Sequence, residues 1–193
     1  KPSLRNRGFK LVLLSIRKLT DISDINFTNS ELVDGQGIVW NNTNQNWNHH
    51  EFVLSDYAEI SANASGTEQT GIGTSFVKVT QFDTNVAAKE STADAANDKI
   101  TLGATGEFIC QCYLSFEGSN NAFYTFAIFV NGVEVANLDA QRKLGTGADV
   151  GTISWVGFFA GTSGQDVDVR VKTGGTVDVL TIHHGTLSIE ELD

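Results

Sequence analysis

The sequence has 193 residues, 40% of them hydrophobic and 9% aromatic, with 19 Gly, 1 Pro and 2 Cys. This composition excludes collagen-like, coiled-coil and largely disordered chains. No apolar run approaches the roughly 20 residues of a membrane-spanning helix, so membrane insertion is not expected. The net charge of −10 is unevenly distributed, because residues 1–18 hold six basic and no acidic side chains, whereas the other 175 residues hold seven basic and 23 acidic ones. An acidic body of this kind repels nucleic acid.

Residues 1–18 form a basic N-terminal arm. We interpret it as an anchoring arm whose six cations bind an acidic surface; an edge strand with a solvated basic face is the alternative. Its apolar part, Leu11–Ile16, is shorter than the hydrophobic region of a usual signal peptide, and no small-residue cleavage site follows it.

Residues 19–50 are rich in Asn, Asp and Thr. Their apolar side chains, among them Ile38, Trp40 and Trp47, are too few to offset the conformational entropy lost when about thirty residues become ordered. The segment therefore requires neighbouring copies of itself, or another protein, to bury these side chains.

From residue 57 the pattern changes to apolar residues at every second position, which is typical of β-strands. Asn131-Gly132 is a strong signal for a two-residue hairpin turn, and the polar stretch Ala87–Asn97 is expected to be a loop. Many short strands without amphipathic helices predict an all-β, antiparallel sandwich or jelly roll. The expected strands are Tyr57–Ser61, Ser75–Phe82, Lys99–Leu102, Glu107–Glu117, Ala122–Val130, Val133–Leu138, Val150–Ala160, Val167–Lys172 and Val177–Ile189.

The expected strand Ala122–Val130 is apolar on both faces. One face carries Phe123 and Phe129, and the other carries Tyr124 and Phe126. In a two-layer sandwich only one face of a strand meets the core, so the second face must be covered by another chain or by a loop of this one. Much of the expected strand Val150–Ala160 is likewise apolar on both faces, with Ile153, Trp155 and Phe159 on one and Val156 and Phe158 on the other. We predict an oligomer in which these strands line the interface, because burying several aromatic rings releases substantial free energy.

Cys110 and Cys112 are two residues apart on another expected strand. Their side chains therefore lie on one face, in a poor geometry for a disulfide between them. We interpret both as small core residues.

Several short runs carry a resemblance to a known family. They are Tyr57-Ala-Glu-Ile60, Phe76-Val-Lys-Val79, Ile100-Thr-Leu102, Gly106-Glu-Phe108, Tyr124-Thr-Phe-Ala-Ile-Phe-Val-Asn-Gly132, Asp166-Val-Asp-Val-Arg-Val171 and Leu187-Ser-Ile189. Through them residues 57–192 resemble the complement globular-head and tumour-necrosis-factor-like (TNF-like) jelly roll, in the version found in bacteriophage virion proteins. Residues 19–48, with Ser23-Asp-Ile25, Asp34-Gly-Gln36 and Trp40, resemble a short module of phage tail-fibre and spike shafts.

The resemblance implies a compact homotrimer with aromatic strands packed about a threefold axis. It also implies that three copies of the Asn-rich module share one small core. The function it implies is structural or adhesive: the family decorates capsids, tips fibres or binds cell-surface ligands.

Other residue types suggest chemistry that we weigh as alternatives. The pairs His49-His50 and His183-His184 can ligate a metal around a threefold axis, but no spaced Glu or His ligands accompany them. The acid pairs Asp166 with Asp168 and Glu190 with Glu191 suggest a glycosidase, which needs two carboxylates facing each other across a cleft. We expect no catalytic residues, no metal site and no cofactor. Calcium is the one ion that we keep as an alternative, because five aspartates in expected loops can supply oxygen ligands. These are Asp83, Asp94, Asp98, Asp139 and Asp149.

The sequence thus predicts a basic arm (1–18), a fibre-type anchoring and trimerisation module (19–50) that is short and β-rich, and a jelly-roll head domain (51–193). We expect a non-enzymatic, homotrimeric virion surface protein, either a short fibre or a capsid-decoration knob, whose partners are its own copies, other virion proteins and a host cell-surface glycan or receptor. A secreted receptor- or glycan-binding module of the same fold is the alternative, and a carbohydrate-active enzyme is a further one.

Three sets of residues are expected to carry these roles. Virion docking is assigned to Arg5, Arg7, Lys10, Arg17, Lys18, Ile38, Trp40 and Trp47. The trimer interface and core are assigned to Phe123, Tyr124, Phe126, Ile128, Trp155 and Phe159. Ligand recognition is expected in polar loops at the distal end, with Asn63–Gly73, Gly118–Asn121, Lys143–Asp149 and Thr162–Gln165 as candidates.

Overall fold

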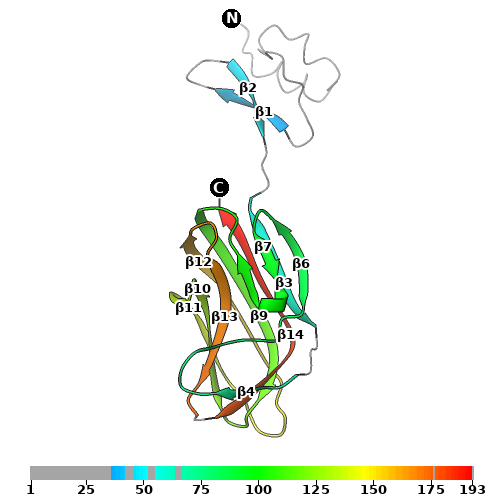
Figure 1. Ribbon diagram of the computed structural model, residues 1–193, viewed down its shortest axis with the longest axis vertical. Helices are drawn as coiled ribbons and strands as arrows, with labels where there is room; N and C mark the ends of the chain where they lie inside the picture. The colour runs from blue at the N-terminus through cyan, green and yellow to red at the C-terminus, as the bar shows by residue number, and fades with distance from the viewer. Residues whose placement is uncertain (1–35, 42–45, 52–54, 64–66, 176, 193) are drawn as a thin grey trace, which may run out of the picture. The chain divides into compact units, whose positions relative to one another are not determined.

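The computed structural model describes residues 36–41, 46–51, 55–63, 67–175 and 177–192. The chain divides into two units, with the boundary between Leu54 and Ser55. The first unit contains the antiparallel hairpin of β1 (Gln36–Asn41) and β2 (Asn46–Glu51), and the second contains all the other strands (Figure 1).

The second unit is a sandwich of two six-stranded sheets in which all the strand pairs are antiparallel. The first, the β9–β14 sheet, has the order β12 (Gly151–Gly161), β9 (Gly106–Gly118), β14 (Asp178–Leu192), β3 (Tyr57–Asn63), β6 (Thr84–Lys89), and β4 (Gln69–Ile72) also pairs with β14. The second, the β10–β13 sheet, has the order β11 (Val133–Lys143), β10 (Phe123–Val130), β13 (Asp166–Thr173), β8 (Lys99–Thr101), β7 (Thr92–Asp94), and β5 (Val77–Lys78) also pairs with β13.

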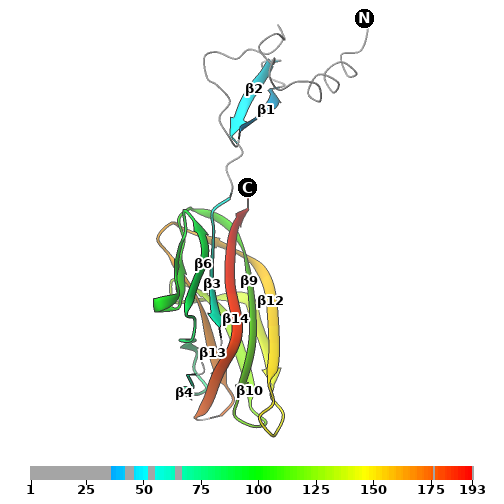
Figure 2. The same ribbon diagram turned by 90° about the vertical axis from the view of Figure 1, so that its right-hand side faces the viewer.

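This arrangement confirms the prediction of an all-β antiparallel jelly-roll sandwich. Figure 2 shows β6, β3, β14, β9 and β12 side by side in one layer, as their hydrogen-bonded pairing requires. Among the described residues the only helical turn is the 3₁₀ segment η2 (Ala95–Asn97). No helix in the described part of the chain is long and apolar enough to cross a membrane.

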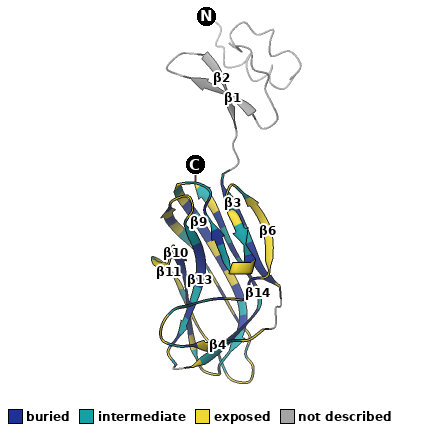
Figure 3. Cartoon of the chain, viewed as in Figure 1, coloured by how far each residue is buried: buried dark blue, intermediate teal, exposed yellow. Residues whose placement is uncertain are grey.

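The core lies between the sheets because alternate side chains of both layers point inward. In β9 every second residue from Phe108 to Phe116 is buried, and these include Cys110 and Cys112. The Phe116 ring packs edge-on against Tyr124 at 5.4 Å and against Phe126 at 4.9 Å across the sandwich. Figure 3 shows the same alternation of buried and exposed positions along the strands of both sheets. Each large apolar side chain buried here contributes about 1.5–3 kcal/mol.

The hairpin between β10 and β11 forms where the sequence predicts it. Asn131 and Gly132 both have positive φ angles, 49° and 81°. A two-residue type I′ turn requires this backbone conformation, and Asn-Gly adopts it with little strain.

The stretch Ala87–Asn97 differs from the expected loop. It contains the end of β6, all of β7 and the turn η2. Most of β6 is exposed on both faces, so no apolar alternation marks it, and backbone pairing with β3 alone defines it. In the expected strand Ser75–Phe82, by contrast, only Val77 and Lys78 pair as a strand.

Candidate interaction surfaces

The aromatic residues assigned to the trimer interface and core divide between the interior and the surface. Tyr124, Phe126 and Ile128 are fully buried, and Phe159 is 6% exposed. Phe159 stacks on Phe108, with 5.4 Å between the ring centroids. These four side chains belong to the core of one sandwich, so they leave no surface for a neighbouring subunit.

The outward face of β10 is covered mainly by its own chain. The ring of Phe76 packs edge-on against Phe129 at 5.2 Å, and the guanidinium of Arg170 lies over Phe129 at 4.3 Å from the ring centroid. Ala127 on the same face is also buried. Of the two covers that the sequence left open, another chain or a segment of this one, the structure places the second over Phe129. Phe123 is the exception, because 47% of it remains exposed.

An apolar patch lies instead on the outward face of the β9–β14 sheet. Phe158 is 65% exposed, Val156 61% and Tyr113 42%. The register places Phe158 opposite the partly exposed Ile109 on β9, so these side chains share one surface. We call Ile109, Tyr113, Val156 and Phe158 the apolar strip.

The two residues of β12 assigned to the trimer interface and core, Trp155 and Phe159, lie on its inner face, whereas the apolar strip lies on its outer face. Trp155 lies half-buried on the inner face of β12, 6.3 Å from the Phe126 ring, and its indole N–H has no hydrogen-bond partner among the described groups. Val156 and Phe158 of the strip form the second apolar face that the sequence shows for this strand.

The outward face of the β10–β13 sheet has a different chemistry. Of the seven basic residues that follow residue 18, six lie on strands of this sheet. These six are Lys78, Lys99, Arg142, Lys143, Arg170 and Lys172, and alternation places all of them but Arg142 on the outward face.

Buried and half-buried acids neutralise part of this charge. Asp168, 4% exposed, accepts hydrogen bonds from Arg170 at 2.7 and 3.1 Å, and Lys78 lies 3.8 Å away. The hydrogen bond from Arg170 to Asp168 raises the pKa of the guanidinium. Asp166 accepts from Lys99 at 2.9 Å and from Thr101 at 2.7 Å. Burial alone would raise the pKa of Asp166, but these hydrogen bonds outweigh it and lower the pKa.

Lys143 and Lys172 differ from these cations because neither forms an ion pair with a described residue. Instead each lies over an aromatic ring. The Lys143 Nζ is 5.2 Å from the centroid of Phe123, and the Lys172 Nζ is 4.1 Å from that of Phe76. A cation held over a ring by its quadrupole keeps its charge available to solvent.

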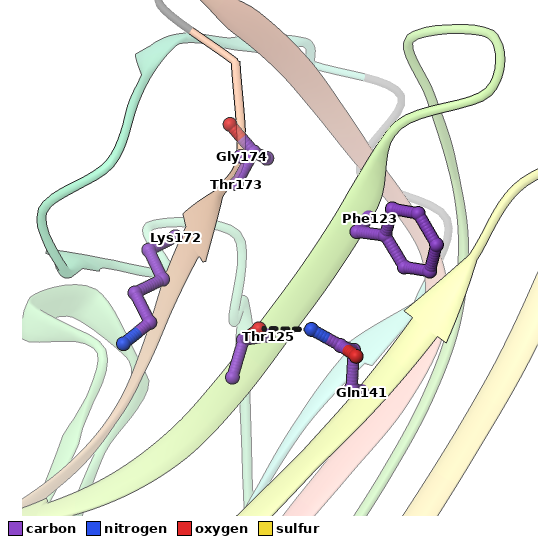
Figure 4. A pocket seen from close by; sticks show the side chains of 6 residues that line it. All are labelled: Phe123, Thr125, Gln141, Lys172, Thr173 and Gly174. Atoms are coloured by element: carbon purple, nitrogen blue, oxygen red, sulfur yellow. Dashed lines mark hydrogen bonds between the residues drawn. The ribbon is translucent and has the colours of Figure 1, made fainter.

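An open hollow of about 420 Å³ lies on this face, lined by Phe123, Thr125, Gln141, Lys172, Thr173 and Gly174 (Figure 4). The amide nitrogen of Gln141 donates a hydrogen bond to the hydroxyl oxygen of Thr125, with 3.1 Å between them. The hollow thus combines an exposed ring, a hydroxyl, an amide and a cation.

The acid pair Asp166 and Asp168 lies on one face of β13, and a different cation holds each carboxylate. Two carboxylates on opposite sides of a cleft, as a glycosidase needs, are therefore not found at this pair. His183 lies 3.6 Å from a carboxylate oxygen of Glu117, while His184 is exposed. Within the described residues, no three or more His, Cys, Asp or Glu side chains group to hold a metal ion.

Four of the five loop aspartates left open for calcium bind nearby groups of the chain. Asp98 accepts from the backbone N–H of Phe82, and Asp149 accepts from that of Gly145. Asp83 and Asp94 accept from neighbouring polar groups, and Asp139 is exposed on β11. Burial raises the pKa of Asp98.

The buried cysteines have no such polar partners. Burial raises the pKa of the Cys110 thiol to about 12 and that of Cys112 well above its usual value. Both are free thiols. A thiol with a raised pKa forms little of the reactive thiolate at neutral pH.

The four candidate recognition loops do not form one cluster. Backbone bonds join Asn121 to Gly145, and so connect the loops 118–121 and 143–149. The loop 162–165 binds Leu102 and Thr105 instead, at the opposite end of β13 from the hollow. In the fourth candidate loop, Asn63–Gly73, residues 64–66 lie outside the described part of the chain.

The docking residues Arg5, Arg7, Lys10, Arg17 and Lys18 lie outside the described residues. Ile38, Trp40 and Trp47 lie on the β1–β2 hairpin. Its register places Trp40 opposite Trp47 and Ile38 opposite His49.

No protein-family model matches the sequence, and no curated protein matches it. Among solved structures, the chain is similar to the structure of Eiger TNF from S. frugiperda, with 10% sequence identity over 73% of this chain and 94% of that one, and a TM-score of 0.49.

Proposed function

We propose that this chain is a structural, non-enzymatic, homotrimeric surface protein of a bacteriophage virion, as a short fibre or a capsid-decoration knob. Its N-terminal part docks on the particle, and its jelly-roll head is displayed for particle stability or adhesion to the host surface. The apolar strip on the β9–β14 sheet is the observation that carries the proposal.

The strip supports self-association on energetic grounds. Three of its four side chains are more than 40% exposed, and β9 and β12 contain no Lys or Arg to cover them. Each large apolar side chain moved from water into an interface contributes about 1.5–3 kcal/mol, and a closed ring buries the strip of every subunit.

The virion assignment is supported by the sequence resemblance of residues 19–48 and 57–192. The basic arm, residues 1–18, fits docking on an acidic particle surface, because its charge is opposite to that of the surface. The acidic remainder of the chain would be repelled by the same surface. Ile38, Trp40 and Trp47 supply apolar groups for the same contact.

A secreted receptor- or glycan-binding module of the same fold is the second candidate. The hollow beside Phe123 is the observation behind it, since a receptor- or glycan-binding module needs such a site. Secretion of the natural precursor would distinguish it from a virion protein.

The first test measures the molar mass of the full chain by light scattering after size exclusion. We expect three times the chain mass of 20.8 kDa. Val156→Asp should shift the mass to that of one chain, because a carboxylate cannot be desolvated in an apolar interface. Val133→Asp is the matched control, because Val133 is 70% exposed but lies on the other sheet. A folded wild-type monomer contradicts the trimer, and dissociation by both variants contradicts the placement of its interface on the apolar strip.

The second test removes residues 1–18. We expect an intact trimer that no longer attaches to the cognate particle, measured by co-sedimentation. Normal attachment of the truncated protein would contradict the anchoring role of the arm.

A further inference from the structure

We propose that the hollow on the outward face of the β10–β13 sheet binds a carboxylate-bearing saccharide. This inference deepens the adhesive part of the proposed function, on which it rests, by naming a site and a ligand class. The ring of Phe123 contacts the sugar's C–H face, Thr125 and Gln141 bind its hydroxyl groups, and Lys172 pairs with its carboxylate.

The position of the hollow suits a displayed site. The head begins at Ser55, and Tyr57 pairs with Glu190 near the end of β14. Phe123 lies beside Tyr124, whose hydroxyl donates a hydrogen bond to Val179 at the start of β14. Val179 and Glu190 are eleven positions apart on β14, or about 35 Å, so the hollow lies at the opposite end of the sandwich from Tyr57, where the head begins (Figure 1).

The lining fits a sugar better than a bare anion or an apolar molecule. A pyranose presents C–H groups on one face and hydroxyl groups at its rim. Phe123, 47% exposed at the edge of the hollow, offers a ring for the C–H face. The hydrogen bond between Gln141 and Thr125 leaves the Gln141 carbonyl oxygen, its second N–H and the Thr125 hydroxyl proton free to bind hydroxyl groups. An inorganic anion would make no use of the ring, and an apolar ligand would leave the amide and hydroxyl unpaired.

The charge of the face indicates an acidic sugar. Arg170, Lys78 and Lys99 are neutralised by Asp168 and Asp166. Lys172 lines the hollow and Lys143 lies over Phe123, and neither forms an ion pair with a described residue. In a protein with 23 acidic and 13 basic residues, two cations on one face that have no acidic partner among the described residues make a local positive field that attracts an anionic ligand.

The hollow and the apolar strip lie on opposite faces of the sandwich, because they belong to the outward faces of different sheets. Self-association through the strip therefore leaves the hollow accessible. Each subunit of a trimer would present one site, and attachment to a surface coated with the same sugar would gain from this multivalency.

The experiment titrates the full chain with three acidic oligosaccharides, each paired with a neutral counterpart, and measures Kd by ligand-observed NMR. The pairs are trigalacturonate with its methyl ester, hyaluronan hexasaccharide with chitohexaose, and 3′-sialyllactose with lactose. We expect at least one acidic probe to bind at least about tenfold more tightly than its neutral counterpart.

Two variants in the hollow and one matched control locate the binding. Phe123→Ala and Lys172→Gln should each raise the Kd at least about fivefold, since each removes one of the proposed contacts. Arg142→Gln also removes one positive charge, but alternation places Arg142 on the opposite face of β11 from Gln141 and Lys143, so its Kd should change by less than about twofold. Phe123 and Arg142 are exposed and Lys172 is partly so, and circular dichroism of each variant checks the fold.

The remaining outcomes decide against the proposal. It fails if no acidic probe binds below about 10 mM, if the neutral sugars bind equally well, or if Arg142→Gln weakens binding as much as Lys172→Gln. The molar mass of the same samples separates this result from the proposed function: a trimer without sugar binding overturns only the site, whereas a monomer that binds the sugar overturns only the trimer.

Discussion

The outward faces of the two sheets differ in whether a cation covers their aromatic rings. On the β9–β14 sheet, Phe158 and Tyr113 are exposed, and the strands that carry them contain no Lys or Arg. On the β10–β13 sheet, cations lie over Phe76, Phe123 and Phe129.

The difference shows how one fold can offer two kinds of contact. A cation over a ring covers apolar surface while its charged end stays hydrated, so such a face remains compatible with water and with polar ligands. A face without cations can hide its rings only against another apolar surface. We therefore assign protein association to the β9–β14 face and ligand binding to the β10–β13 face.

The strongest test of this assignment places the same charge on each face. Phe158→Asp should dissociate the trimer, because it puts a carboxylate into the apolar strip. Phe123→Asp should leave the trimer intact, because its cationic surroundings stabilise the new charge. Sedimentation velocity of both full-length variants measures the effect. Equal behaviour of the two would show that the faces do not differ in the way proposed.

The sequence predicts the strands that have one buried face. Period-two alternation locates β9, β10, β12 and β13 because their inward residues must be apolar. It does not reveal β6, whose side chains are mostly exposed and whose identity comes from pairing with β3.

The interaction surfaces are harder to derive from the sequence. Residues 122–130 show that β10 has two apolar faces, but not that Phe76, more than forty positions earlier, covers Phe129. The hollow likewise unites residues 123, 125, 141 and 172–174, which only the register of β10 with β11 and β13 brings together. Such long-range pairings leave no local pattern to read.

A second prediction concerns the acid that holds the cations of the β10–β13 face in place. Asp168→Ala should lower the free energy of unfolding by about 3 kcal/mol, because it leaves the partly buried Arg170 without its partner. Asp139→Ala, an exposed acid on the same sheet, should change it by less than about 0.5 kcal/mol. Urea unfolding at one fixed protein concentration measures both, since the stability of an oligomer depends on concentration. A loss below about 1 kcal/mol for Asp168→Ala would mean that Arg170 is held mainly by its contact with Phe129.

The smallest effect is expected at the more exposed pair of Asp166 and Lys99 on the same face, and it depends on pH. The pKa of Asp166 is lowered, so its ionised form adds stability that is complete above its unfolded pKa of about 3.9 and is lost as the pH falls through the folded pKa. The pKa of Lys99 is raised by its hydrogen bond to Asp166, so its contribution is complete below about pH 10.4 and is lost as the pH rises through the folded pKa.

Asp166→Asn should therefore cost a constant amount, about 0.5–1 kcal/mol for a solvent-screened pair, from about pH 5 to pH 9, and progressively less below about pH 4. Urea unfolding of wild type and variant across this range measures the difference, and a difference that grows as the pH falls would contradict the stabilising sign assigned to Asp166.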